Sequence, residues 1–250
     1  MRIGVVGCAG RMGQMLVREI AATPGAVLAG GSERPGGPHV GRDVAQLAGL
    51  EAAGVAVVDD PAELFAHADA VIDFTSPEAT ERHAALAAQS ETALVLGTTG
   101  LSAAQHEVVL KAATHTPIIQ APNMSVGVNL LLALVEQVAR TLDDDYDIEI
   151  VEMHHRHKVD APSGTALGLG RAAALGWTGP RPKGEIGFAT LRGGDVAGDH
   201  TVVFAADGER IELTHKASNR GVFAKGAVRA ALWAADKPPG LYSMREVLGL

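Results

Sequence analysis

Five side chains in a row that can carry positive charge, from His154 to Lys158, stand in the second half of the chain. An imidazole titrates near neutral pH and can donate a proton, and a lysine can hold a carboxylate or supply a proton itself. Ser163-Gly164-Thr165 follows where a helix is expected to begin, and its hydroxyls and backbone N–H groups suit an anion. These residues predict a pocket for a small substrate with carboxylates, beside a proton donor. The residues alone leave open which imidazole donates.

Two simpler interpretations of this segment compete with that pocket. A basic run is often a solvated loop, but a solvated loop does not need the turn from Asp160 to Thr165 into a helix. Three histidines, His154, His155 and His157, could also bind a metal ion. No carboxylate stands at the spacing of a metallohydrolase motif such as H-E-x-x-H, so the sequence predicts no metal.

A second group of residues has the spacing of a phosphate-binding turn. Gly7, Gly10 and Gly13 follow the first apolar run, where glycines allow a tight turn and a close approach of the backbone to a pyrophosphate. Glu33 stands about 20 residues after the last glycine, which suits a hydrogen bond from an adenosine ribose. Arg34 can pair with a 2′-phosphate, so the two residues predict use of both NADH and NADPH.

Two further loops follow expected strands, namely Gly97-Thr98-Thr99-Gly100 and Ala121-Pro122-Asn123-Met124. Ligands of open α/β sheets lie beyond the carboxyl ends of the strands. The loops can therefore supply backbone and hydroxyl partners for a nicotinamide carboxamide. Ordinary turn chemistry explains the Gly-Thr-Thr-Gly loop nearly as well.

Short β-rich runs alternate with helical stretches in the first half, which predicts a parallel sheet with crossover helices. Asp60, Ser76 and Ser102 stand where they can cap three of the helices. The expected strands are Arg2–Val6, Ala26–Gly30, Val55–Val58, Ala70–Phe74, Ala93–Leu96 and Pro117–Gln120. The expected helices are Arg11–Ala22, Pro61–Ala66, Pro77–Ser90 and Ser102–Thr114.

The second half has a different pattern, which predicts a separate mixed or antiparallel sheet. An amphipathic helix is expected over Ser125–Leu142 and a final helix over Val222–Ala235. Gly208 marks a hairpin turn between the last two strands. The expected strands are Asp147–Met153, Ile186–Leu191, His200–Ala205 and Arg210–Thr214.

The composition is that of a globular chain, with 250 residues, 47% of them hydrophobic. A net charge of −8 argues against binding to nucleic acid or to an anionic membrane, although it does not describe the cationic segment itself. The single cysteine, Cys8, excludes a disulfide framework and is expected to pack under the glycine turn. No apolar stretch approaches the ~18 residues of a membrane span, and no signal-peptide pattern is present, which predicts a cytoplasmic protein.

Five segments carry a resemblance to a known family. They are Gly7–Gly13, Asp73–Pro77, Gly97–Gly100, Ala121–Asn129 and Glu152–Ala166. The chain closely resembles the dihydrodipicolinate reductase family, from Ile3 to the final helix. The resemblance implies reduction of 4-hydroxy-tetrahydrodipicolinate to tetrahydrodipicolinate with NADH or NADPH, in the diaminopimelate route to lysine. It also implies an α/β fold, with a Rossmann-type parallel-sheet domain and a smaller α+β domain that carries a mixed sheet.

The resemblance further implies domains, partners and site residues. Residues 1–125, completed by about 220–250, would bind the dinucleotide, and residues 126–219 would bind the dicarboxylate substrate and form a homotetramer. His154 would be the proton donor and Lys158 the second catalytic group. The substrate would be bound by His155, Gly164, Thr165 and Arg220. The dinucleotide would be bound by Gly7, Cys8, Ala9, Gly10, Arg11, Met12, Glu33, Arg34, Gly97, Thr98, Thr99, Ala121, Pro122, Asn123 and Met124.

The chain departs from longer family members between Thr165 and Ile186, where it is shorter, and this leaves the local surface and subunit contacts open. Asp73 and Phe74 are interpreted as core and strand-end residues outside the site. Another two-domain nicotinamide-dependent amino-acid or sugar dehydrogenase competes as a function, but is not expected to carry the His154–Thr165 segment. A non-catalytic dinucleotide-sensing protein would bind the cofactor without turnover and would need a surface for a partner.

Overall fold

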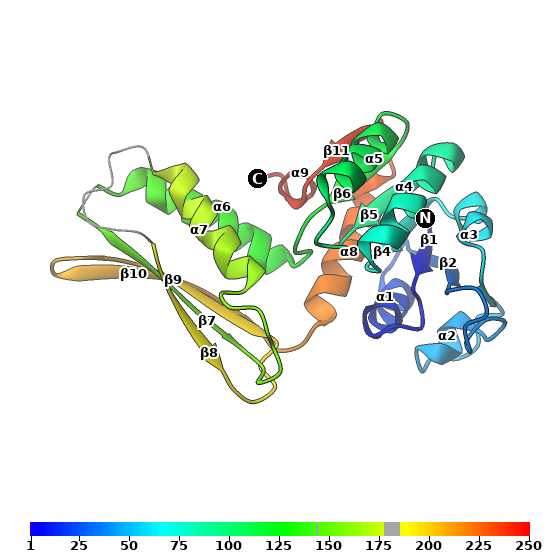
Figure 1. The fold of residues 1–250 in the computed structure, drawn as a ribbon, viewed down its shortest axis with the longest axis horizontal. Coiled ribbons are helices and arrows are strands. Elements are labelled where there is room, and N and C mark those ends of the chain that lie inside the picture. Colours follow the sequence, from blue (N-terminus) through cyan, green and yellow to red (C-terminus); the bar gives the residue numbers. More distant parts are fainter. Residues whose placement is uncertain (144, 178–185) are drawn as a thin grey trace. The chain divides into compact units, whose positions relative to one another are not determined.

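The computed structural model describes residues 1–143, 145–177 and 186–250, and the chain divides into two compact units. Unit 1 comprises Met1–Ser125 and Gly221–Gly249, and unit 2 comprises Val126–Arg220 together with Leu250. Figure 1 shows the elements of both units, coloured along the chain. Part of the segment in which the sequence departs from longer family members, residues 178–185, lies outside the described residues.

Unit 1 is built on a seven-stranded sheet in the order β11-β6-β5-β4-β1-β2-β3, in which every recorded pair is parallel. The strand order reverses direction between β1 and β4, and ligands of doubly wound sheets bind beyond the carboxyl ends of the strands at such a point. The strands are β1 (Arg2–Val6), β2 (Val27–Ser32), β3 (Val57–Val58), β4 (Ala70–Asp73), β5 (Ala93–Leu96), β6 (Pro117–Gln120) and β11 (Gly240–Tyr242).

Helices cover both faces of this sheet, with α3, α4 and α5 on one face and α1 and α8 on the other (Figure 1). The central strands β4 and β5 are buried along their whole length, because a parallel sheet covered on both faces needs continuous apolar runs. The helices are α1 (Arg11–Ala22), α2 (Val44–Leu47), α3 (Pro61–His67), α4 (Pro77–Ser90), α5 (Ala103–Ala113), α8 (Gly221–Ala234) and α9 (Met244–Leu248).

The expected helix caps are confirmed. The side chain of Asp60 accepts a hydrogen bond from the backbone N–H of Ala62, and that of Ser76 accepts one from Ala79. Ser102 forms a capping box with Gln105. These caps satisfy N–H groups that have no partner inside the helix, so helix starts are readable from local sequence.

Unit 2 carries a four-stranded mixed sheet in the order β10-β9-β7-β8. β7 pairs with β8 in parallel, whereas the β7–β9 and β9–β10 pairs are antiparallel. Two helices, α6 (Val126–Thr141) and α7 (Gly164–Gly176), pack together, and a Cβ on Gly176 would lie 2.1 Å from the carbonyl oxygen of Glu136. The strands are β7 (Asp147–His154), β8 (Gly187–Arg192), β9 (Gly198–Ala206) and β10 (Glu209–Ala217).

Alternation along β7 decides which of its side chains enter the core of unit 2. Ile148 and Ile150 are buried in a cluster with residues of α6 and α7. Glu152 and His154 continue the same alternation and are also buried. Successive side chains of a strand point to opposite faces, so two ionisable groups lie on the core face of this strand.

The fold class expected from the sequence, a Rossmann-type parallel sheet with a second mixed sheet, is confirmed. The helix expected over 222–235 is not the final element, because β11 and α9 follow it. The four-residue helix α2 was not expected either. Across the described residues, no helix has the length and apolar character needed to cross a membrane.

Candidate active site

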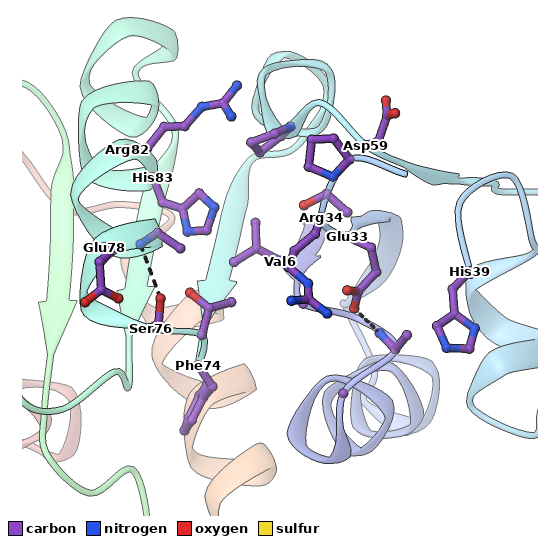
Figure 2. Close-up of a pocket in the computed structure, with 18 residues that line it drawn as sticks. Val6, Glu33, Arg34, His39, Asp59, Phe74, Ser76, Glu78, Arg82 and His83 are labelled. Atoms are coloured by element: carbon purple, nitrogen blue, oxygen red, sulfur yellow. Dashed lines mark hydrogen bonds between the residues drawn. The ribbon is translucent and has the colours of Figure 1, made fainter. Parts of the chain in front are cut away.

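A pocket of about 690 Å³ lies in unit 1 beyond the carboxyl ends of β1, β2 and β4. Figure 2 shows Glu33 and Arg34 on one side of this pocket, and Ser76, Glu78 and His83 on the other. The pocket therefore occupies the place where the strand order reverses. Of the residues expected to bind a dinucleotide, the ones that line it are Gly7, Ala9, Gly10, Glu33 and Arg34.

The glycine turn has the geometry that the spacing predicts. Gly7 has a φ of +67°, and its N–H donates to the carbonyl of Ser32 at 2.8 Å. A Cβ on Gly13 would lie 2.2 Å from the carbonyl oxygen of Gly7, so only glycine allows the helix to pack this closely on the turn. Gly10 is the N-cap of α1 and provides no side-chain cap, so the first turn can present its N–H groups to an anion.

Glu33 is held above this turn, since its Oε1 accepts a hydrogen bond from the N–H of Ala9 at 2.8 Å (Figure 2). A carboxylate accepts several hydrogen bonds, which leaves capacity for ribose hydroxyls. Cys8 is buried, and a Cβ on Gly31 would lie 2.6 Å from its Sγ. Burial, with Glu33 adding to it, raises the pKa of Cys8 to about 12, so the thiol is a packing group, as expected.

The other expected dinucleotide residues do not line this pocket. Thr98, Thr99, Ala121 and Pro122 line a second cavity of unit 1, of about 510 Å³. Met124 is buried, Arg11 is exposed and Met12 is half-buried. The Oδ1 of Asn123 accepts from the N–H of Ser125 at 2.8 Å. A Cβ on Gly97 would lie 2.5 Å from the ring of Phe74, so this glycine is a packing position.

Asp73 is a core residue, as the sequence indicated, but it is also a buried hub beside the pocket, which the sequence did not indicate. Asp73, at the end of β4, is fully buried and accepts hydrogen bonds from the N–H and the hydroxyl of Thr75, at 2.8 and 2.6 Å. It also accepts from the hydroxyls of Thr80 and Thr98, at 2.9 and 3.2 Å, and contacts Nδ1 of His83 at 2.8 Å. Phe74, Thr75 and His83 line the pocket. The available signal was a carboxylate as the last residue of an apolar strand.

In unit 2, a buried carboxylate holds the imidazole that the resemblance marks as the proton donor. Nδ1 of His154 lies 2.5 Å from Oε2 of Glu152, and both side chains are buried. Burial lowers the pKa of His154, and the charges of Lys158 and Arg192 add to that shift, whereas Glu152 opposes it. Glu152 is the first residue of one of the five family segments, but the sequence alone indicated no role for it.

Lys158 lies in the loop after this strand and is half-buried. Its Nζ forms an ion pair with Asp160, at 2.7 and 2.8 Å to the two oxygens. The hydrogen bond from Lys158 lowers the pKa of Asp160, so this carboxylate is ionised and holds the ammonium group in place. Two groups capable of proton transfer, an imidazole and an ammonium, thus belong to one short segment of unit 2.

The expected substrate-binding residues of unit 2 form two groups, namely the Arg220–His155 pair and the start of α7. Nη2 of Arg220 lies 3.4 Å from Nε2 of His155, which must accept this hydrogen bond because a guanidinium only donates. Gly164 and Thr165 form the first turn of α7, after the N-cap Ser163, whose Oγ accepts from the N–H of Ala166 at 3.1 Å. A helix N-terminus favours negative charge, which suits a carboxylate.

A second buried histidine packs beside His154. The ring of His200 meets that of His154 edge to face, with centroids 5.1 Å apart, and its Nε2 lies 2.9 Å from Oγ of Ser163. Burial, followed by the charge of His154, lowers the pKa of His200 to about 4. His200 is therefore neutral near pH 7 and was not singled out by its sequence position. Among the described residues, no group of three or more His, Cys, Asp or Glu side chains is placed to hold a metal ion.

The doubly wound sheet and the glycine-turn pocket define a two-domain protein with a nucleotide-binding domain. Family models described as the N-terminus and the C-terminus of dihydrodipicolinate reductase match residues 1–124 and 127–248. The chain belongs to the dihydrodipicolinate reductase family, which confirms the resemblance.

Relatives of known name agree with this family. The chain is 55% identical to 4-hydroxy-tetrahydrodipicolinate reductase 1 of Mesorhizobium japonicum, over 100% of this chain and 97% of that protein. It is 53% identical to 4-hydroxy-tetrahydrodipicolinate reductase of Brucella abortus, over 100% and 99%. A dipicolinate-bound dihydrodipicolinate reductase from Paenisporosarcina sp. TG-14 has the same fold, with a TM-score of 0.82 at 24% identity and 98% of each chain covered.

Proposed function

We propose that this protein reduces 4-hydroxy-tetrahydrodipicolinate to tetrahydrodipicolinate with NADH or NADPH, in the cytoplasm, as a step of the diaminopimelate route to lysine. The observation that carries the proposal is the Glu152–His154 pair at the end of β7, in the same unit as Lys158 and the start of α7. A proton donor beside an anion-binding helix start matches a dicarboxylate substrate, and the names of the relatives specify which one.

The residues of unit 1 fit a dinucleotide. The uncapped start of α1 and the glycine turn suit its pyrophosphate, and Glu33 suits a ribose. When bound, NAD(P)H would supply a hydride from C4 of its nicotinamide to the substrate ring, from which the 4-hydroxyl group would leave with a proton as water. The residues proposed to hold it are Gly7–Met12, Glu33, Arg34, Gly97–Thr99 and Ala121–Met124.

The residues of unit 2 supply the proton and bind the substrate in this proposal. Nδ1 of His154 is engaged by Glu152, so Nε2 is the atom that can exchange a proton with the substrate. Lys158 is the second catalytic group. The two carboxylates are held by His155, Gly164, Thr165 and Arg220, through charge-assisted contacts and the dipole of α7.

Turnover tests the proposal directly. Substrate is generated in situ from pyruvate and aspartate semialdehyde by a coupling synthase, and oxidation of NAD(P)H is followed at its absorbance band. Substrate-dependent oxidation is expected with this protein present. No substrate-dependent signal at micromolar enzyme would contradict the reductase assignment and would favour a dinucleotide-sensing protein.

Replacing Arg34 by alanine is expected to weaken NADPH binding selectively, by about 10- to 150-fold, because a charge-assisted contact to the 2′-phosphate is worth roughly 1.5–3 kcal/mol. Arg34 lines the pocket next to Glu33, on the side shown in Figure 2. Binding is measured by titrating protein fluorescence with each cofactor. NADH serves as the internal control, since it lacks that phosphate. Equal losses for both cofactors would count against the proposed role.

The proposal includes a homotetramer formed by the open face of the unit 2 sheet. Val151 and Met153 point away from the buried face of β7, and they stand opposite Ala189 and Leu191 of β8. Leu191 is 50% exposed in the single chain. A strip of apolar side chains on an otherwise uncovered sheet face is typical of a subunit contact.

Replacing Leu191 by glutamate is therefore expected to convert the tetramer into smaller species, because the charge would have to be desolvated at the contact. Light scattering coupled to size-exclusion chromatography measures the mass. Leu175→Glu is the matched control, since Leu175 is 72% exposed on α7 and is not part of that sheet face. An unchanged tetramer mass in the Leu191 variant would place the subunit contact elsewhere.

A further inference from the structure

We propose that Glu152 is a positioning residue that holds His154 in one tautomer, with Nδ1 protonated and Nε2 presented for proton transfer, and that Arg192 fixes the plane of the Glu152 carboxylate in that role. The inference rests on the proposed function for the identity of the reaction. Its physical content, the state of the His154 ring, can be measured without turnover. All the residues involved belong to unit 2.

The two oxygens of Glu152 are surrounded by donors from three different elements. Oε2 lies 2.5 Å from Nδ1 of His154 and 2.9 Å from Nη1 of Arg192. Oε1 accepts from Nη2 of Arg192 at 2.9 Å, from the N–H of Ser163 at 3.1 Å and from the hydroxyl of Thr190 at 3.2 Å. Glu152 is 1% exposed. A guanidinium that binds both oxygens fixes the plane of the carboxylate.

The pairing of the strands explains how these donors come together. Glu152 stands opposite Thr190 on β8, and His154 stands opposite Arg192. Arg192 also donates to the carbonyl of Asp160 at 2.7 Å, which ties the loop of Lys158 to the same carboxylate. The contact from Ser163 ties in the start of α7. Glu152 thus connects the histidine, the lysine loop and the proposed anion site.

The tautomer of His154 follows from these contacts. An ionised carboxylate has only acceptors, so Nδ1 must carry the hydrogen that it shares with Glu152. In the neutral ring Nε2 is then a bare acceptor, and in the protonated ring it is the donor. A Cβ on Gly198 would lie 3.0 Å from this Nε2, so glycine at that position keeps a side chain away from the reactive atom.

Electrostatics support an ionised Glu152. Burial alone would raise its pKa, but the hydrogen bonds and charges of Arg192 and His154 outweigh burial and hold the pKa of Glu152 below its usual range. Buried ion pairs add little net stability compared with apolar packing, so stability alone does not account for this arrangement. The charged or titratable groups that face His154 are Glu152 on its own strand, Arg192 on β8, His200 on β9, and Lys158 and Asp160 in the following loop.

The test uses two variants with opposite expected effects on the same ring. Glu152→Gln removes a negative charge, so the pKa of His154 falls further; Arg192→Gln removes a positive charge, so that pKa rises. A proton donor works only while protonated, so the rate falls as pH rises through its pKa. The alkaline limb of the kcat profile is therefore expected at lower pH in Glu152→Gln and at higher pH in Arg192→Gln. At neutral pH Glu152→Gln is expected to lose about 100-fold in kcat.

Nitrogen-15 NMR of the His154 ring supplies the readout that a purely structural role would not change. The wild-type ring is expected in the Nδ1-protonated form when neutral, and the Glu152→Gln ring as a mixture of tautomers, because an amide can also donate. Arg192→Lys keeps the charge and is expected to restore the wild-type titration. Glu107→Gln, an exposed glutamate of α5, removes the same charge and is expected to change neither measurement.

The outcomes separate this inference from the proposed function. An unchanged His154 titration in both Glu152→Gln and Arg192→Gln would overturn the inference, whatever happened to kcat. Absence of reductase activity in the wild type would overturn the proposed function only, because the ring can still be titrated. If Glu152→Gln fails to fold, the Arg192 variants test the inference. A higher His154 pKa in Arg192→Gln that returns to the wild-type value in Arg192→Lys would support it, and an unchanged pKa in Arg192→Gln would overturn it.

Discussion

Replacing His154 by alanine is expected to lower kcat by about 10²- to 10⁴-fold, the range that positioned proton transfer contributes. The dissociation constant for NADH is expected to stay within about twofold, because changes at separate, independent sites usually do not couple. The pocket proposed for the dinucleotide is lined by residues of unit 1, whereas His154 belongs to unit 2. Lys158→Ala is expected to show the same split between kcat and NADH affinity.

His157→Ala is the matched control for this experiment. His157 stands in the same cationic run, but its side chain is exposed. The ring of His154, in contrast, is buried and contacts the carboxylate of Glu152. Removal of the His157 ring is expected to change kcat by less than about threefold, because an exposed, solvated imidazole is not held in a fixed position for proton transfer. Stopped-flow turnover gives kcat, and fluorescence titration gives the NADH affinity. If either His154→Ala or Lys158→Ala lost NADH binding with kcat otherwise intact, the division of labour between the two units would be wrong.

Most of the sheet of unit 1 was predictable because its signals are local. Strands β5 and β6 have the bounds that the sequence indicated, since each is a short apolar run between turn residues. The start of α4 was predictable because Ser76 and Pro77 supply both the cap and the first helical residue. Local chemistry determines these boundaries, and the rest of the chain does not need to be known.

Two elements near the end of unit 1 were missed for different reasons. β11 is a three-residue strand that exists only because it pairs with β6 at the edge of the sheet, and so short a run carries no periodic signal. α9, in contrast, has a readable start, because Ser243 and Glu246 form a capping box. However, α9 is only five residues long, so no helical periodicity extends beyond its capped start.

The site shows the same division between local and non-local information. The glycine turn and Glu33 were predicted, because spacing along the chain is enough to place them. Arg192, Thr190 and His200 were not, because they meet Glu152 and His154 only through the register of three strands. A sequence shows which residues can do chemistry, but the partners that tune them come from elements far away in the chain.

Asp73 is another residue whose partners come from distant elements of the chain, and its replacement is expected to have a large effect. Replacing it by asparagine is expected to lower the free energy of unfolding by about 3 kcal/mol, because an amide removes a buried anionic acceptor and turns one of its two acceptor atoms into a donor that faces other donors. Thr75 and Thr98 would lose an anionic acceptor. Since Thr75 lines the proposed dinucleotide pocket, NADH binding is expected to weaken as well, by about tenfold.

The stability difference between wild type and Asp73→Asn is also expected to depend on pH. Burial alone would raise the pKa of Asp73, but its hydrogen bonds from His83 and Thr75 hold that pKa below the usual range. A carboxyl whose folded pKa is depressed adds stability above its unfolded pKa, about 3.9, and loses it as pH falls through the folded value. The difference in stability between wild type and Asp73→Asn is therefore expected to be full near pH 7 and to shrink in acid.

Urea unfolding at several pH values measures the loss of stability and its pH dependence, with Asp69→Asn as the matched control. Asp69 stands just before the same strand, but its ion pair with Arg2 is exposed, with 41% of the Asp69 side chain accessible. Its loss is expected to cost less than about 1 kcal/mol. Equal unfolding midpoints for Asp73→Asn and wild type at pH 7 would show that the hub is dispensable. The expected result is a lower unfolding midpoint for Asp73→Asn than for Asp69→Asn, with a difference that becomes smaller in acid. That result would show that the buried negative charge of Asp73 holds together the loops after β4 and β5.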